Sequence, residues 1–279
     1  MGEDGSAIHW LKSAARIIRV LVLGLVVLGV VSAVLPRPGN RGGAALSNVL
    51  PREFRVPEPI APAFAARDPS PIRPDKWDSV WSIVERHTAV RARPAPDSQV
   101  VGRLSTVTPE GTDNIVLILD RKTGLDDRLW VHVRFPSLPN GAAGWVPRGA
   151  LGGYGVVHTR LVIDLSAFSA RLYDKGRMLF ESSVGIGKPE WPTPTGAFYV
   201  RNRLADFADP FYGPVALGIS ARSSVLTDWP TGGFVGIHGT DRPELVPGRV
   251  SHGCVRMRNS DIRKLDRLMP VGTPVIIRP

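Results

Sequence analysis

From residue 77 onward, the sequence consists of short β-rich runs separated by turn residues, and this pattern restricts what the chain can fold into. The run at residues 130–135, WVHVRF, places successive side chains on alternate sides, as a half-buried strand does. Clusters rich in proline, asparagine, aspartate and glycine, such as residues 94–97 and 139–141, lie between the runs and favour turns. We therefore expect a mainly β protein made of many short strands.

The first folded part is expected at residues 77–153. Its predicted strands lie at 88–93, 99–104, 115–120, 129–135 and 144–147. Five strands within so short a stretch favour a small β-barrel.

The second folded part, residues 154–279, again has a mostly β pattern. Its predicted strands lie at 156–165, 171–173, 178–184, 198–201 and 274–277. A short helix is also predicted, with Ser260 as its N-terminal cap. Its apolar face consists of Ile262, Leu265, Leu268 and Met269.

The N-terminal region carries an uncharged apolar run at residues 20–35. With Ile17 and Ile18 added, it spans about 28 Å as a helix, close to the ~30 Å thickness of a hydrocarbon core. We expect a transmembrane signal-anchor at residues 17–35 that follows a cytoplasmic tail at 1–16. A cleaved signal peptide is the alternative, because small residues have the spacing of a cleavage site near the end of the run. A buried core helix is a third interpretation.

A proline-rich segment follows at residues 36–76. It contains nine prolines, which remove backbone donors and fix φ, so we expect an extended spacer without a core of its own. Such a linker would let the folded parts work at a distance from a membrane. An unstructured remnant with no length requirement is the other interpretation.

The chain is strongly basic. Lys and Arg number 35 against 25 Asp and Glu, which gives a net charge of +10 and a pI near 10.4. This balance favours an anionic partner, such as nucleic acid, an anionic membrane or a polyanionic cell wall. No basic–aromatic stripe or nucleic-acid-binding motif is visible, so we do not expect a nucleic-acid partner.

Cys254 is the single cysteine of the chain. It can form no internal disulfide and cannot supply a zinc-finger ligand set, so we expect neither a metal nor another cofactor. The thiol is either a buried bystander or a reactive group. Reactivity requires a nearby base or positive field, and His238 and His252 are the candidates. Gly239 and Gly253, which follow these two histidines, permit tight backbone turns.

Four sequence segments in the second part resemble the catalytic domain of the L,D-transpeptidases of the YkuD type. They are HGT at 238–240, SHGCVRM at 251–257, GIGKP at 185–189 and TPTGAF at 193–198. The resemblance covers about residues 157–278. Residues 80–152 are similar to bacterial Src-homology-3-like domains, through the pieces VRARPAPDSQVVGRL and WVHVRF…GAAGWVP. Such domains often bind wall peptides or glycans, and a rigid spacer is the equal alternative here.

The resemblance implies a β-sandwich with a short helix and a peptidoglycan cross-linking activity. Cys254 would attack the peptide bond before the terminal D-alanine of a stem tetrapeptide, forming a thioester acyl-enzyme and releasing D-alanine. The side-chain amine of a second stem's third residue would then give a 3→3 cross-link. Carbapenems would acylate the same thiol, and the catalytic domain would lie outside the cytoplasm, membrane-anchored, or secreted if the signal is cleaved.

The resemblance also assigns roles within the site. His238 would be the base, oriented by the carbonyl of Gly239, with His252 as an alternative base. The backbone N–H groups of residues 252–254 would bind the oxyanion, and Ser251 would hydrogen-bond the turn.

Two further residues are candidates for substrate contacts. Arg256 would meet a stem-peptide carboxylate or, alternatively, clamp backbone carbonyls. Tyr212 lies with Phe211 and Trp229 in the segment 203–235, which could form a lid that excludes water. Packing anchors are the equal alternative for these aromatic side chains.

Two other functions remain open from the sequence. An L,D-carboxypeptidase would use water in place of the amine acceptor. A catalytically silent wall-binding protein would keep the fold without the chemistry.

Overall fold

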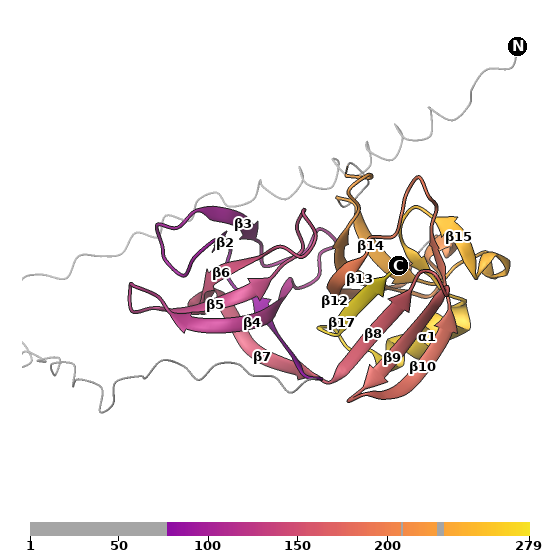
Figure 1. Cartoon of the computed structure of the whole chain (residues 1–279), viewed down its shortest axis with the longest axis horizontal. Helices are drawn as coiled ribbons and strands as arrows, with labels where there is room; N and C mark the ends of the chain where they lie inside the picture. Colours follow the sequence, from indigo (N-terminus) through magenta and orange to yellow (C-terminus); the bar gives the residue numbers. More distant parts are fainter. Residues whose placement is uncertain (1–76, 208, 228–231) are drawn as a thin grey trace, which may run out of the picture. The chain divides into compact units, whose positions relative to one another are not determined.

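Figure 1 shows the computed structural model of the chain, which describes residues 77–207, 209–227 and 232–279. These residues belong to one compact unit, Pro62–Pro279, and form two sheets with one short α-helix. The expectation of a mainly β protein is therefore confirmed. The apolar run at 17–35 and the proline-rich segment at 36–76 lie outside the described residues. Within the described ranges, no helix is long and apolar enough to cross a membrane.

The first sheet is antiparallel throughout, with its seven strands in the order β3-β2-β6-β5-β4-β1-β7. The strands are β1 (Ser79–Val84), β2 (Thr88–Arg91), β3 (Val100–Leu104), β4 (Ile115–Thr123), β5 (Leu129–Arg134), β6 (Ala143–Pro147) and β7 (Leu151–Val157), with the 3-10 helix η1 (Arg148–Ala150) before β7. The five predicted strands correspond to β2 through β6. A Src-homology-3-like barrel stays a prediction.

Two strands of the first sheet, β1 and β7, were not predicted from the sequence, for local reasons. β1 carries Ser82 at an inward position, where the buried hydroxyl donates to the carbonyls of Gly152 and Gly153. β7 has the sequence LGGYGVV, and its three glycines lower its apparent strand propensity. The predicted strand at 156–165 is in fact two strands, because β7 ends at Val157 in the first sheet and the next strand starts the second. The first sheet thus extends beyond the expected boundary at 153–154.

The second sheet is mixed, with ten strands in the order β10-β9-β8-β17-β12-β13-β14-β16-β11-β15. The strands are β8 (Thr159–Asp164), β9 (Ser169–Asp174), β10 (Arg177–Ser183), β11 (Gly185–Gly187), β12 (Gly196–Ala205), β13 (Val215–Arg222), β14 (Phe234–His238), β15 (Gly248–Ser251), β16 (Val255–Arg256) and β17 (Pro274–Arg278). The remaining elements are η2 (Pro210–Tyr212), η3 (Pro243–Leu245) and the helix α1 (Asn259–Leu268). The predicted strands in this part correspond to β8, β9, β10, β12 and β17.

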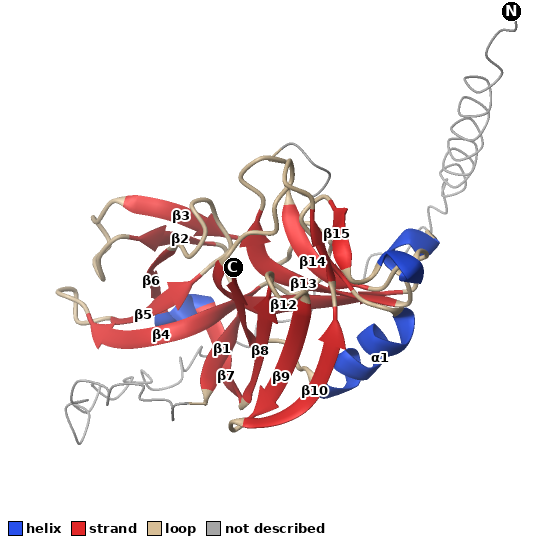
Figure 2. Cartoon of the chain, turned by 45° about the vertical axis from the view of Figure 1, so that its right-hand side comes forward, coloured by secondary structure: helices blue, strands red, loops and turns tan. Residues whose placement is uncertain are grey.

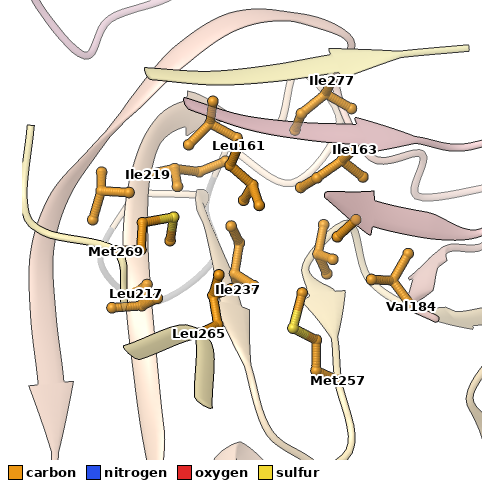
Figure 3. Packing of buried hydrophobic residues seen from close by; sticks show 14 of the residues in the cluster. Leu161, Ile163, Val184, Leu217, Ile219, Ile237, Met257, Leu265, Met269 and Ile277 are labelled. Atoms are coloured by element: carbon orange, nitrogen blue, oxygen red, sulfur yellow. The ribbon is translucent and has the colours of Figure 1, made fainter. Parts of the chain in front are cut away.

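β12 joins the two halves of this sheet. Its residues 196–199 pair with β17, and its residues 200–205 pair with β13. Side chains from both halves belong to one buried cluster, which includes Leu161 and Ile163 of β8, Leu217 of β13 and Ile237 of β14 (Figure 3). The resemblance predicted a β-sandwich. In the structure, the strands of this part form one hydrogen-bonded sheet whose two halves share a core.

The helix α1, shown in blue in Figure 2, differs from its prediction at the N-terminus. The residue before its first turn is Arg258, which provides no side-chain cap, and Ser260 lies inside the helix. The prediction of a Ser260 cap is wrong. Ile262 and Leu265 are buried as expected, because they face the shared core.

The prediction of a lid at residues 203–235 is wrong for the middle of that segment. β13 occupies it, and seven of its eight residues are buried, so it is a central strand. This strand was not predicted from the sequence, because it contains small and polar residues such as Gly218 and Ser220. The buried Ser220 hydroxyl accepts a hydrogen bond from the Tyr199 N–H, which compensates its burial.

Candidate active site

Two adjacent strands bring the candidate nucleophile and base together. β14 ends at His238 and β16 begins directly after Cys254, and the two strands are parallel with Ile237 opposite Val255. The Cys254 Sγ accepts a hydrogen bond from the N–H of Gly236 at 3.4 Å. Cys254 and His238 line the same two clefts. The structure therefore unites residues that are far apart in the sequence.

His238 is fixed in one tautomer by its backbone contact. Its side chain is buried, and its Nδ1 lies 2.6 Å from the carbonyl oxygen of Gly239. Because a carbonyl oxygen only accepts hydrogen bonds, Nδ1 must carry the proton, and Nε2 of the neutral ring keeps its lone pair. The imidazole is thus oriented by the carbonyl that the sequence singled out, with Nε2 available as a base.

Burial keeps both reacting groups uncharged. It lowers the pKa of His238 to about 4, against the opposing effect of the hydrogen bond that the ring donates to the Gly239 carbonyl and with a smaller lowering by the charge of Arg256. Burial also raises the pKa of the Cys254 thiol, although the Gly236 N–H and Arg256 act in the opposite direction. At neutral pH the resting site therefore holds a thiol and a neutral imidazole. Attack by this thiol would require transfer of its proton to a base, and the neutral imidazole of His238 is the neighbouring acceptor.

The turn before Cys254 depends on glycine and serine. Gly253 has φ +112, a conformation that residues with a Cβ rarely adopt. The Ser251 hydroxyl donates to the carbonyl of Cys254 at 2.5 Å and accepts from the N–H of Gly253 at 3.1 Å. Ser251 therefore stabilises the turn, as predicted. The Gly253 N–H thus already donates to a side chain, and oxyanion binding by the N–H groups of residues 252–254 stays a prediction.

Thr193 connects the two upstream motifs to this turn. Its hydroxyl accepts from the N–H of Gly187 and donates to the carbonyl of Gly253, both at 2.9 Å. A Cβ on Gly187 would lie 2.2 Å from the carbonyl oxygen of Trp191, so this close approach requires glycine. The GIGKP and TPTGAF segments are thus structural supports of the turn that carries Cys254.

His252 has surroundings unlike those of His238. Its side chain is exposed, and its ring centroid lies 4.2 Å from that of Trp191. It lines the first cleft. This placement favours a role at the rim and leaves His238 as the better-positioned base.

Arg256 is a buried cation beside the site. Its guanidinium lies 4.4 Å from the ring centroid of Phe211, and its Nε has no hydrogen-bond partner within the described part of the chain. No carboxylate within salt-bridge distance of it is found among those residues. Burial lowers the pKa of Arg256 from its ordinary, very high value. An unneutralised guanidinium in this position can receive an anionic group.

Tyr212 lies directly against the base. Its ring centroid is 5.2 Å from that of His238, and burial raises its pKa. The Asp209 carboxylate accepts from the N–H of Phe211 and caps the 3-10 helix that presents both aromatic residues. Tyr212 therefore lies at the candidate site, and its contact with a substrate stays a prediction. Trp229 of the same segment lies outside the described residues.

Two clefts meet at the candidate pair. The first, of about 40 Å³, is lined by Arg256, His252 and Ser251. The second, of about 330 Å³, is lined by Glu110, Arg201 and Asn202. Five residues line both clefts: Tyr212, Phe234, Val235, His238 and Cys254. The pair can therefore be approached by two different groups.

Several site residues were not predicted from the sequence. The Asn259 Oδ1 accepts from the N–H of Thr240 at 2.9 Å and would lie 2.3 Å from a Cβ on Gly239. Asn259 thus anchors the turn after His238, and its position next to a helix start was the only available signal. Glu110 and the β12 pair of Arg201 and Asn202 carried no signal, because only the tertiary fold brings them to the site. No group of three or more His, Cys, Asp or Glu side chains suited to a metal occurs in the described ranges.

A family model provides the assignment of this part. Residues 158–277 match the YkuD L,D-transpeptidase catalytic domain. The curated L,D-transpeptidase YkuD of Bacillus licheniformis is 33% identical over 120 residues, which cover 43% of this chain and 66% of that protein. The protein of the same name in Bacillus subtilis is 32% identical, with coverages of 42% and 64%. The matched region thus spans slightly less than two thirds of these relatives.

Solved structures give a weaker likeness. An Enterococcus faecium L,D-transpeptidase structure has 27% identity and a TM-score of 0.35, covering 43% of this chain and 49% of that one. A Mycobacterium tuberculosis L,D-transpeptidase 3 structure with a faropenem-derived adduct has 16% identity and a TM-score of 0.36, with coverages of 55% and 91%. The family match and the curated relatives carry the assignment. Residues 158–277 are a YkuD-type L,D-transpeptidase catalytic domain.

Proposed function

We propose that the chain is a peptidoglycan L,D-transpeptidase that forms 3→3 cross-links between stem peptides through an acyl-enzyme on Cys254. The observation that carries the proposal is the junction of two clefts at Cys254 and a His238 whose Nε2 is free to accept a proton. One cleft can bring a donor to the thiol while the other admits an acceptor. The family assignment of residues 158–277 supports the substrate class.

In the acylation step, Cys254 Sγ attacks the carbonyl carbon that precedes the terminal D-alanine of the donor. The thiol proton passes to His238 Nε2, the C–S bond forms, and the C–N bond breaks as the imidazolium protonates the leaving amine. D-alanine departs and a thioester remains. The raised pKa of Cys254 makes the imidazole necessary, since little thiolate exists at neutral pH.

In the transfer step, an acceptor ammonium first loses one proton to water and attacks the thioester as a neutral amine. The new C–N bond forms and the C–S bond breaks. His238 Nε2 takes the second proton of the amine and returns it to Cys254 Sγ. No nucleotide is needed, because the thioester preserves most of the energy of the broken amide.

We further propose that Arg256 binds the carboxylate of the terminal D-alanine in the first cleft. The cleft is narrow, at about 40 Å³, and its lining contains Arg256 and no carboxylate among the described residues. A small anionic group fits both properties. Tyr212, which lies against His238 and lines both clefts, would contact substrate on either side.

Incubation with purified muropeptides, followed by mass spectrometry, tests the function. We expect free D-alanine and a cross-linked dimer. D-alanine with uncross-linked tripeptide alone would instead identify an L,D-carboxypeptidase. No product at all, with intact protein, would identify a wall-binding protein without activity. The same thiol should be acylated by a carbapenem, and an unchanged intact mass would contradict this.

The cellular location of the protein completes the proposal. We place the catalytic domain outside the cytoplasm in a bacterial cell envelope, because its proposed substrate lies there. Residues 17–35 would anchor it in the membrane, or direct its secretion if cleaved, and residues 36–76 would be the spacer. Fractionation of cells that express the full chain would test this placement, and a cytosolic protein would contradict it.

A further inference from the structure

The second cleft contains a group that the family assignment does not cover. Glu110 belongs to the first sheet, outside residues 158–277, yet it lines a cleft that ends at Cys254 and His238. Its carboxylate forms an ion pair with Arg201 of β12. The cleft of about 330 Å³ is within the range of ligand-binding pockets. The two sheets therefore build this wall together.

A short turn fixes the position of Glu110. The N–H of Thr108 donates to the carbonyl of Thr112 at 2.8 Å, and their hydroxyls are also 2.8 Å apart. Gly111, next to Glu110, has φ +80, which glycine adopts without strain. The Asn202 Nδ2 donates to Thr112 Oγ1 at 3.2 Å and to Glu110 Oε2 at 3.3 Å. The turn is thus tied to the catalytic domain at the cleft.

A β-bulge in β12 directs two neighbouring side chains to the same cleft. The register against β13 shifts between Val200 and Asn202. Without a shift, Arg201 and Asn202 would point to opposite faces, whereas both line the second cleft. Their exposed fractions are only 2% and 3%, and Arg201 Nε and Asn202 Oδ1 have no hydrogen-bond partner in the described part of the chain. Buried polar atoms without partners are uncommon in folded proteins, and here two of them lie on side chains that line one cleft.

The two clefts differ in charge. Among the residues that the structure describes, Glu110 is the only carboxylate that lines either cleft, and the first cleft has Arg256 without a carboxylate. Burial pushes the pKa of the Glu110 carboxyl upward, but the hydrogen bond and charge of Arg201 outweigh it, so the pKa lies below its ordinary value. Glu110 is therefore ionised at neutral pH. The second cleft therefore offers a carboxylate that lies in an ion pair with Arg201, and a carboxylate in an ion pair can still accept a further hydrogen bond from an ammonium group. The first cleft offers a guanidinium with no carboxylate partner among the described residues.

We propose that the second cleft binds the amine acceptor and that Glu110, supplied by the first sheet, attracts and positions its primary ammonium group. Arg201 and Asn202 hold the carboxylate in place, and the aromatic side chains of Phe207 and Phe234 enclose the aliphatic part of the acceptor. Glu110 is a positioning residue, since proton transfer remains with His238. This inference rests on the proposed transpeptidase function.

The test separates the two half-reactions in the full chain. Acylation is followed by D-alanine release in a single turnover, and transfer by the dependence of dimer formation on the concentration of an acceptor muropeptide. In Glu110→Gln we expect unchanged acylation, an acceptor KM raised about 10- to 100-fold, and more hydrolysis of the thioester. Asp113→Asn is the matched control, because it removes an exposed carboxylate from the same loop and should leave both half-reactions unchanged.

Other outcomes would overturn the inference. An unchanged acceptor KM in Glu110→Gln, or a loss confined to acylation, would contradict it. If Glu110→Gln does not fold, the double variant Glu110→Met, Arg201→Met removes both buried charges and should show the same selective loss of transfer. Wild-type protein that releases no D-alanine would contradict the proposed function itself, a failure distinguishable from a wild-type enzyme whose transfer is insensitive to Glu110.

Discussion

Arg201 and Arg256 have similar surroundings but different partners. Each is buried, lies over a phenylalanine ring and lines a cleft that ends at Cys254 and His238. Arg201 is neutralised by Glu110, whereas Arg256 has no carboxylate partner among the residues that the structure describes. The guanidinium of Arg201 holds the Glu110 carboxylate in place and so contributes to the architecture of its cleft. The unpaired guanidinium of Arg256 remains available to a substrate anion and lowers the pKa values of both reacting groups.

The largest effect is expected at the point where the clefts meet. His238→Ala should lower acylation and transfer together, by about 10²- to 10⁴-fold, because both steps use Nε2. Single-turnover D-alanine release and dimer formation measure the two steps. The exposed His252→Ala is the control and should retain most activity. A greater loss in His252→Ala than in His238→Ala would assign the base to His252 instead.

Substitutions at the two arginine sites should change the free energy of unfolding in different directions. Glu110→Ala leaves Arg201 buried and unpaired, so the free energy of unfolding should fall by about 3–5 kcal/mol at neutral pH. Arg256→Met removes a charge that has no partner to lose, so stability should be unchanged or increased. Urea unfolding of both variants beside wild type measures this. Equal losses in the two variants would contradict the difference in pairing.

Substitution of Arg256 should lower the activity, although it should not lower the stability. Arg256→Met should lower kcat/KM for a tetrapeptide donor by about 10- to 100-fold, through the lost carboxylate contact. Arg256→Lys should recover part of this. A donor whose terminal carboxylate is amidated provides the control, since it should be insensitive to the substitution. If the amidated donor loses as much activity, Arg256 is a structural clamp to carbonyls.

The pH dependence should give the smallest effect. Since burial lowers the pKa of His238 to about 4, its ring stays neutral and competent as a base well below pH 6. The acid limb of kcat/KM for the donor should therefore lie near pH 4. At pH 5.5 the enzyme should retain about ten times the rate allowed by an ordinary histidine with a pKa of ~6.5. An acid limb near 6.5 would show that the ring is not buried in solution.

The folded Glu110 carboxyl has a pKa below its unfolded value, so its ion pair stabilises the fold above the unfolded pKa. This contribution is lost as the pH falls through the folded pKa. The acid limb should accordingly be measured with initial rates after brief exposure.

The sequence predicted the parts of the site that lie in continuous segments. Cys254, His238 and Gly239 could be recognised because the continuous segments that contain them, HGT and SHGCVRM, resemble the motifs of the L,D-transpeptidases. The burial that tunes their pKa values could not, since it depends on side chains packed from β13 and η2. The lid prediction was wrong at β13, because Gly218 and Ser220 give this buried strand a composition typical of a loop. Glu110 was unpredictable for a stronger reason, because only the contact between the two sheets brings it to the cleft.

The central claim is that Cys254 carries the acyl group between two substrates. Intact-mass measurement of the protein, quenched in acid after mixing with a tetrapeptide donor, tests it most directly. We predict an adduct with the mass of the donor lacking D-alanine, located on Cys254, absent from Cys254→Ala and discharged by an acceptor muropeptide. D-alanine release at the wild-type rate by Cys254→Ala, or an adduct on another residue, would contradict the account.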